Sequence, residues 1–334
     1  MKKVSKKVLA LMAGLGILTS FSQMSASEVI KIDGSSTVYP ITEGVAEEFQ
    51  KVKKGAVKVT VGISGTGGGF KKFCRGETDI SDASRPILKK EMELCKANGI
   101  SYIELPVAYD GLAVVVNPKN TWATCLTVEQ LKEVWKPESQ GKKFYWSDLN
   151  PNWPKEEIRL CGAGSDSGTF DYFTEAIMGK AKAQRGDYLA SEDDNVLVQF
   201  AQREKGALCY FGLAYVAENE GKIKPVAIKN PKTGKCVLPS LETVKSGEYQ
   251  PLSRPLFIYV NAKAAERPAV KEFVEFYIKN APKISKQVGY IPLPDKAYEL
   301  VKKRFEKRKI GTVFGGEPEV GLTIEELLKR EAKH

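Results

Sequence analysis

The segment from Val57 to Phe73, VKVTVGISGTGGGFKKF, decides the fold because it changes from a strand pattern to a helix pattern within a few residues. Residues 57–63 alternate apolar and polar side chains, as a half-buried strand does. The Ser-Gly-Thr-Gly-Gly-Gly turn at 64–69 then opens a stretch that begins with Phe70. A strand that runs through a turn of small residues into a helix is the building unit of an α/β fold.

The same unit occurs twice more. Asp33 to Thr37 (DGSST) precedes a helical period that starts at Val38, and residues 162–169 (GAGSDSGT) follow a strand-like run and open a helix at Phe170. Each turn offers backbone N–H groups and hydroxyls at a helix N-terminus, which is a ready site for an anion. One such turn is typical of an ordinary helix cap, whereas three in one chain favour convergence on a single small anion. The turn at 64–69 fits neither a P-loop nor GxGxxG, which disfavours nucleotide binding.

Strand-like and helical segments alternate along the rest of the chain. The sequence predicts further short strands at residues 29–32, 102–107, 112–117, 158–161, 207–211, 226–228 and 256–261. Apolar residues recur at steps of three and four over 38–52, 170–177 and 270–278. This pattern predicts an α/β fold with mixed, mostly parallel sheet.

Two strands end alike, AVVVN at 113–117 and FIYVN at 257–261, and the pattern breaks after each. If both strands are hinge crossings, residues 28–117 plus 262–334 form one lobe and residues 118–261 the other. Two lobes joined by two extended segments suit hinge closure around a ligand.

The composition excludes several kinds of chemistry. The chain has 334 residues and a mean hydropathy of −0.28, as expected for a soluble globular protein of one or two domains. Its one histidine is the last residue, His334, so a Ser-His-Asp triad or a histidine-ligated metal site is not expected. We expect no cofactor and no bound metal.

Residues 1–27 have the pattern of a secretory signal peptide. Four lysines precede an apolar run from Val8 to Leu18, and Ser25-Ala26-Ser27 offers small residues for cleavage. We therefore expect a periplasmic protein that begins near Glu28. Removing the segment leaves 47 basic against 41 acidic side chains, a net charge of +6, which favours a small anion, and basic clusters interleaved with aromatics that would indicate nucleic acid are absent.

Six cysteines in an exported protein favour disulfides, and no CxxC spacing suggests metal or redox chemistry. We prefer three pairs, which are Cys74 with Cys95, Cys125 with Cys236, and Cys161 with Cys209. The alternative for the last pair is two free buried thiols on strands.

The segment DISDASRP at 79–86 supplies charge for an anion site. Arg85 offers a planar fork that matches a tetrahedral oxyanion, and the Ser84 hydroxyl can donate beside it. A carboxylate can accept the proton that hydrogenphosphate carries and sulfate lacks, so an acidic acceptor would distinguish the two. Asp82 and Asp110 are the candidates for this acceptor, and a structural role in a cap or turn is the alternative for each.

Seven motifs occur in order over essentially the whole mature chain. They are GSSTVYP at 34–40, SGTGGGF at 64–70, DISDASRP at 79–86, AYDGLAVVVN at 108–117, DSGTFDYF at 166–173, SEDDNVLVQ at 191–199 and PLSRPLFIYVN at 251–261. Together these motifs resemble those of the periplasmic phosphate-binding proteins of the Pst ABC transporter. The resemblance implies a two-lobe periplasmic binding protein fold of type II that closes on one dehydrated phosphate and docks onto a membrane permease.

Carried over residue by residue, the resemblance implies a phosphate-binding set. Its members are Ser36, Thr37, Gly65, Thr66, Ser84, Arg85, Ser167, Gly168 and Thr169. Many relatives have an arginine four residues before the Ser of the SGT motif, where this chain has Ala163. We therefore expect Arg85 to take the cationic role.

The sequence thus predicts a monomeric receptor for inorganic phosphate with no enzymatic activity and no catalytic residues. A receptor for another tetrahedral oxyanion, sulfate or molybdate, would keep the same turns and need no acceptor for a ligand proton. A secreted phosphatase is the less favoured hypothesis, because only Ser167 near Asp166 suggests a nucleophile with a base.

Overall fold

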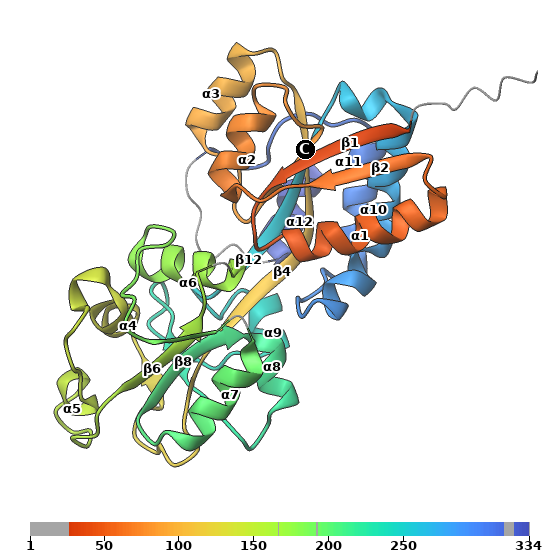
Figure 1. Cartoon of the computed structure of the whole chain (residues 1–334). Helices are drawn as coiled ribbons and strands as arrows, with labels where there is room; N and C mark the ends of the chain where they lie inside the picture. The colour runs from red at the N-terminus through yellow and green to blue at the C-terminus, as the bar shows by residue number, and fades with distance from the viewer. Residues whose placement is uncertain (1–26, 166, 192, 317–323, 334) are drawn as a thin grey trace, which may run out of the picture.

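The computed structural model describes residues 27–165, 167–191, 193–316 and 324–333. All but one residue of the predicted signal peptide lie outside this part. Figure 1 shows two groups of elements, one containing the first and last elements of the chain, β1 and α12, and the other the middle of the chain, connected through β4 and β12. Within the described residues, no helix is long and apolar enough to cross a membrane.

One mixed sheet runs through both groups. Its strand order is β2-β1-β3-β12-β4-β8-β6-β7, with β9 paired to β4. These strands are β2 (Val57–Val61), β1 (Glu28–Gly34), β3 (Ile80–Ala83), β12 (Ser253–Asn261), β4 (Tyr102–Val116), β8 (Ala207–Gly212), β6 (Arg159–Ala163), β7 (Leu189–Ser191) and β9 (Lys224–Pro225). A second sheet has the order β11 (Cys236–Val237), β10 (Ala227–Lys229) and β5 (Cys125–Leu126). The prediction of an α/β fold is confirmed.

The sheet is parallel towards both ends and antiparallel in the middle. Strands β2, β1 and β3 run parallel to one another, as do β7, β6 and β8. Strands β12 and β4 are antiparallel to each other and to their outer neighbours. The molecule therefore contains two parallel sets of strands, joined by two central strands of opposite direction.

Strand β4 is a single strand of fifteen residues where the sequence predicts two shorter ones. It pairs with β12 up to Gly111 and with β8 from Leu112 onward. The gap between the two predicted strands, residues 108–111, lies within β4, and the strand changes partner just after it, between Gly111 and Leu112. The pairing partner of β4 therefore changes within the strand. The lobe boundaries at residues 117 and 261 stay a prediction.

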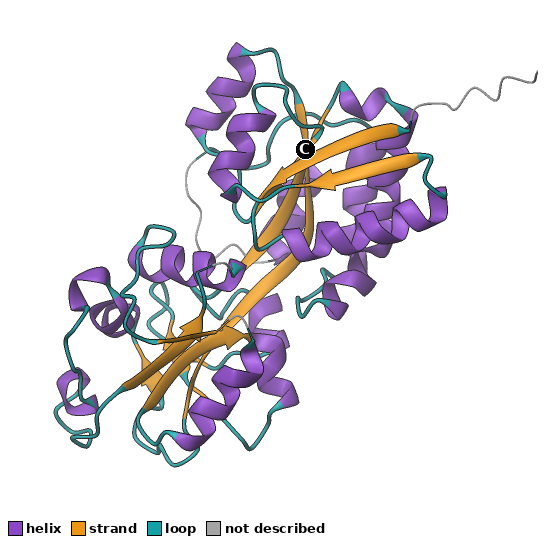
Figure 2. Ribbon diagram, viewed as in Figure 1, coloured by secondary structure: helices purple, strands orange, loops and turns teal. Residues whose placement is uncertain are grey.

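Helices cover both faces of the sheet (Figure 2). The first group carries α1 (Tyr39–Lys53), α2 (Gly65–Phe73), α3 (Lys89–Ala97), α10 (Pro268–Gln287), α11 (Asp295–Glu306), α12 (Ile324–Lys333) and the 3-10 turn η2 (Ala264–Glu266). The second carries α4 (Val128–Trp135), η1 (Pro137–Ser139), α5 (Trp146–Leu149), α6 (Gly168–Met178), α7 (Asp194–Arg203), α8 (Leu213–Glu218) and α9 (Leu241–Lys245). The predicted helical periods at 170–177 and 270–278 lie within α6 and α10, and the period at 38–52 begins one residue before α1, so these three helices are confirmed.

The alternation of side chains along β12 separates two apolar cores. Ile258 and Val260 belong to the core that contains α1 and α10, whereas Phe257 and Tyr259 belong to the core that contains α2. Successive residues of a strand point to opposite faces, so one strand supplies both cores.

The three predicted disulfides are confirmed. Cys74–Cys95 joins the end of α2 to α3, Cys125–Cys236 joins two strands of the small sheet, and Cys161–Cys209 joins residues directly opposite each other on β6 and β8. None of the six cysteines is free.

Asp82, near the end of β3, has a buried carboxyl group. The Asp82 side chain is fully buried, and its Oδ1 accepts a hydrogen bond from the Thr42 hydroxyl at 3.0 Å. The Thr42 hydroxyl also lies 2.8 Å from the Tyr277 hydroxyl. Burial raises the pKa of Asp82 to about 8, the Thr42 hydrogen bond opposes this rise, and the charge of Asp33 adds to it. The folded protein therefore favours the neutral form of Asp82.

We predict that Asp82→Asn stabilises the protein only at high pH. The folded pKa is above the ordinary value, so the wild type loses stability as the pH rises from about 4 to about 8, and asparagine does not titrate. Relative to the wild type, the variant should gain about 4 kcal/mol of unfolding free energy between pH 5 and pH 9. Urea denaturation of both proteins at the two pH values measures the gain, and an equal difference at both would contradict the prediction.

Candidate anion-binding site

The carboxyl ends of the parallel strands position the candidate site. Strands β1, β2 and β3 lead into the segments at 34–38, 62–65 and 84–88, and β6 leads into the segment before α6. In open α/β sheets, ligands bind outside the carboxyl ends of the strands. Helices α1, α2 and α6 also begin here, so the positive ends of three helix dipoles lie at the ends of these strands.

The first and third turns are in direct contact. The Thr37 hydroxyl donates to the Gly168 carbonyl oxygen at 3.0 Å, and the Ser36 hydroxyl donates to Asp171 Oδ2 at 3.0 Å. A Cβ atom at Gly168 would lie 2.6 Å from Thr37 Cα, so only glycine permits this approach. These contacts join the start of α1 to the start of α6 across the two parallel sets of strands.

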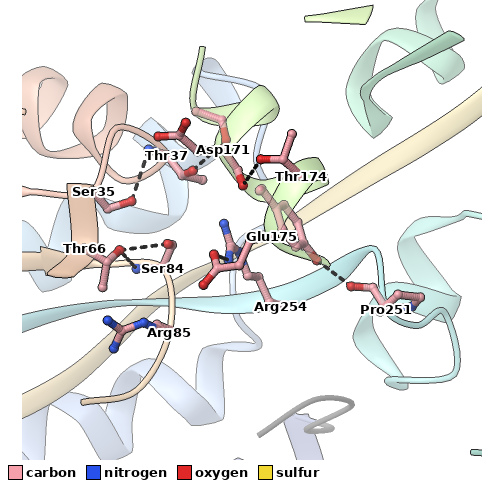
Figure 3. A network of polar contacts seen from close by, with 12 residues as sticks. Ser35, Thr37, Thr66, Ser84, Arg85, Asp171, Thr174, Glu175, Pro251 and Arg254 are labelled. Carbon is pink, nitrogen blue, oxygen red and sulfur yellow. Dashed lines mark hydrogen bonds and ion pairs between the residues drawn. The ribbon is translucent and has the colours of Figure 1, made fainter. Parts of the chain in front are cut away.

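The second turn and the Ser84 segment form another pair. The Thr66 and Ser84 hydroxyl oxygens are 2.9 Å apart, and the Ser84 N–H donates to Thr66 Oγ1 at 3.1 Å (Figure 3). Gly65 begins α2 with a φ of 77°, in the left-handed region that favours glycine. The glycine therefore lets the strand turn sharply into a helix beside Thr66.

Ser167 and Thr169 form an ordinary helix cap at the start of α6. The Ser167 hydroxyl oxygen accepts a hydrogen bond from the Thr169 N–H at 3.1 Å. Asp166, the candidate base in the phosphatase hypothesis, lies outside the described residues.

Arg85 is held by a carboxylate that the sequence reasoning did not select. Its guanidinium donates to Glu91 through Nη1 at 3.0 Å and Nη2 at 2.8 Å, and Nη1 also donates to the Pro86 carbonyl oxygen at 3.2 Å. Burial lowers the pKa of Arg85, but the hydrogen bond and charge of Glu91, and the charge of Glu175, produce a net rise. Both Nη atoms of Arg85 are therefore engaged in one ion pair with Glu91.

The two acceptor candidates are both enclosed. Asp82 faces Thr42 inside the first group, as described above. Asp110 is 3% exposed and lies opposite Arg254 in the ladder between β4 and β12. Burial raises the pKa of Asp110 to about 6, and the charge of Arg254 opposes this rise. Among the described residues, Asp110 Oδ2 has no hydrogen-bond partner.

A second partly buried arginine, Arg254, is the main feature of the site that the sequence analysis did not predict. Arg254 Nη1 donates to Glu175 Oε2 at 2.9 Å, and its guanidinium carbon lies 3.6 Å from the centre of the Tyr172 ring. Figure 3 shows Arg254 and Glu175 pointing toward each other, in the same view as the Thr66–Ser84 pair and Asp171. The signal was present in PLSRPLFIYVN, where an arginine interrupts a strand that is otherwise apolar.

The site therefore combines hydroxyls, helix N-termini and two guanidinium groups. Each guanidinium has a carboxylate partner, which is Glu91 for Arg85 and Glu175 for Arg254. Hydroxyl and N–H donors together with arginine forks are the groups that bind a compact oxyanion. A separate cavity of about 550 Å³ lies at the other end of β6, where Lys142 and Arg159 are among its lining residues.

Comparison with known proteins agrees with this geometry. A family model described as a PBP superfamily domain matches residues 22–281. Protein SphX of Synechocystis is 53% identical, with 95% of this chain and 94% of SphX covered. The phosphate-binding protein PstS of Staphylococcus saprophyticus is 41% identical, with 80% of this chain and 82% of PstS covered.

A solved structure extends the likeness to three dimensions. The crystal structure of a possible phosphate binding protein from Planctomyces limnophilus is 50% identical, with a TM-score of 0.81, and covers 85% of this chain and 100% of its own. The sequence identity, the coverage and the shared fold all indicate the same family. The chain belongs to the PBP superfamily, in the family that includes SphX and the phosphate-binding protein PstS.

Proposed function

We propose that this protein is a receptor that captures inorganic phosphate between its two groups of elements and delivers it to the permease of an ABC transporter. The observation that carries the proposal is the direct contact of Thr37 with Gly168, which brings helix N-termini from both groups to one place. PstS is named for binding phosphate, and this chain shares 41% of its residues over the matched region.

Capture without chemistry fits the residues present. Within the part of the chain that the structure describes, the Ser167 hydroxyl accepts a hydrogen bond as a helix cap and the Thr66 hydroxyl is paired with Ser84, so neither hydroxyl is hydrogen-bonded to a base that would activate it. The donors are suited to holding an oxyanion, and the protein acts by binding and release.

The proposed place of action is outside the cytoplasmic membrane. The lysine-rich, apolar N-terminal segment supports export, and three disulfides suit an oxidising compartment. We propose that the protein acts there as a monomer, binding one phosphate between two lobes divided near residues 117 and 261. Closure would present one shape to the permease, because only the closed form lets both lobes reach the same anion.

The proposed phosphate contacts come from all four segments. They involve the predicted set of Ser36, Thr37, Gly65, Thr66, Ser84, Arg85, Ser167, Gly168 and Thr169. Asp110 stays the better placed of the two proposed proton acceptors, because it lies opposite Arg254 in the ladder, whereas Asp82 faces Thr42 inside the first group.

Calorimetric titration of the ligand-stripped mature protein tests the function. We predict binding of one phosphate per chain that excess sulfate does not abolish. Absence of heat with phosphate would overturn the proposal. Loss of phosphate binding in the presence of sulfate would instead indicate a less selective oxyanion receptor. Turnover of a chromogenic phosphoester would instead indicate an enzyme.

Gly168→Ala tests the contact between the two groups. The added Cβ would collide with Thr37, so α6 could not approach α1, and we predict at least a tenfold loss of phosphate affinity, about the contribution of one hydrogen bond to a charged group. The control is Gly315→Ala, where the added Cβ meets no atom within 4 Å. Unchanged affinity in Gly168→Ala, with a control that also binds normally, would show that this contact is not part of the site.

A further inference from the structure

Arg254 is a partly buried cation with unused hydrogen-bonding capacity. Its side chain is 14% exposed, and Nη1 is its donor to Glu175. The Nε and Nη2 atoms are buried and have no hydrogen-bond partner among the described residues. Buried donors without acceptors are costly, and those of a charged group most of all. An oxyanion beside Arg254 would satisfy these donors.

Arg85 differs from Arg254 in this respect. Both of its Nη atoms are bound to Glu91, and Nη1 also serves the Pro86 carbonyl. The Glu91 side chain is only 8% exposed, and it also accepts the Leu88 N–H at 2.9 Å. Separating this pair would leave a buried carboxylate unpaired, so Arg85 is the less available cation.

The partner of Arg254 is much freer to move. The Glu175 side chain is 36% exposed, and its contact with Arg254 is one hydrogen bond from Nη1. Because it lies at the surface, the Glu175 carboxylate can turn into water with little loss of solvation. Its charge also acts on Arg85, so the carboxylate lies in the field of both guanidinium groups, as a bound anion would.

The guanidinium plane itself is fixed from the other side. It stacks on the Tyr172 ring, and the Tyr172 hydroxyl donates to the Pro251 carbonyl oxygen at 3.1 Å. Tyr172 and Glu175 both belong to α6, whose N-terminus carries Gly168. Arg254 is therefore held in place at the junction of β12 and α6, and Glu175 is the movable member.

We propose, on the basis of the phosphate-receptor function above, that Arg254 is a phosphate-binding residue and that Glu175 is an internal carboxylate that phosphate displaces from it. While Glu175 stays on Arg254, the charges of Asp110 and Glu175 outweigh that of the arginine, and a dianion is repelled. When Glu175 turns away, phosphate takes its place on Nη1 and satisfies Nε and Nη2.

Phosphate titrations of two variants test this displacement. Glu175→Gln removes the competitor, so phosphate affinity should rise about tenfold, and Arg254→Gln should weaken it about a hundredfold. Exposed Glu242→Gln on α9 and Arg203→Gln at the end of α7 make the same charge changes elsewhere and should match the wild type.

Glu175→Asp separates displacement from simple charge repulsion. Aspartate keeps the negative charge but is one methylene shorter, so it reaches Arg254 poorly, and the phosphate affinity of Glu175→Asp should lie above that of the wild type and below that of Glu175→Gln. Wild-type affinity in Glu175→Asp, or weaker binding in Glu175→Gln, would overturn the displacement. Wild-type affinity in Arg254→Gln would overturn the role of Arg254, whereas no phosphate binding by the wild type would overturn the proposed function itself.

Discussion

The change of partner within β4 is the constraint on which the rest of the structure depends. One continuous strand pairs with β12 up to Gly111 and with β8 from Leu112 onward. Since β12 and β4 are antiparallel to the strands outside them, two parallel sets share one sheet with their carboxyl ends toward the junction. The turns after β1 and β6 therefore meet, and the contact between Thr37 and Gly168 follows from the topology.

The two arginine side chains of the site are each paired with a carboxylate. Arg85 is paired with Glu91 in a nearly enclosed bidentate contact, and Arg254 is paired with the more exposed Glu175. Breaking a buried pair is expensive, whereas a pair at the surface exchanges partners at little cost. The burial of the two carboxylates therefore distinguishes a structural ion pair from an exchangeable one, although the two arginines look alike in the sequence.

The sequence predicts local structure well where one segment contains the whole signal. The strand-turn-helix units around residues 57–73 and 158–177 and the three disulfides agree with the structure. The two strands predicted at 102–107 and 112–117 are one strand, because a local pattern does not show that a strand continues while it changes partner. Glu175 could not be matched to Arg254 because 79 residues separate them, and pairing at that distance depends on how strands are ordered in the sheet.

A crystal structure of the mature protein grown with phosphate would show where the anion binds and where the Glu175 carboxylate lies. We expect one phosphate at the junction of the two parallel sets, within hydrogen-bonding distance of donors from both groups and of Arg254, with the Glu175 carboxylate turned toward solvent. Phosphate bound in the cavity beside Lys142 and Arg159 at the other end of β6, with Glu175 still on Arg254, would contradict this expectation.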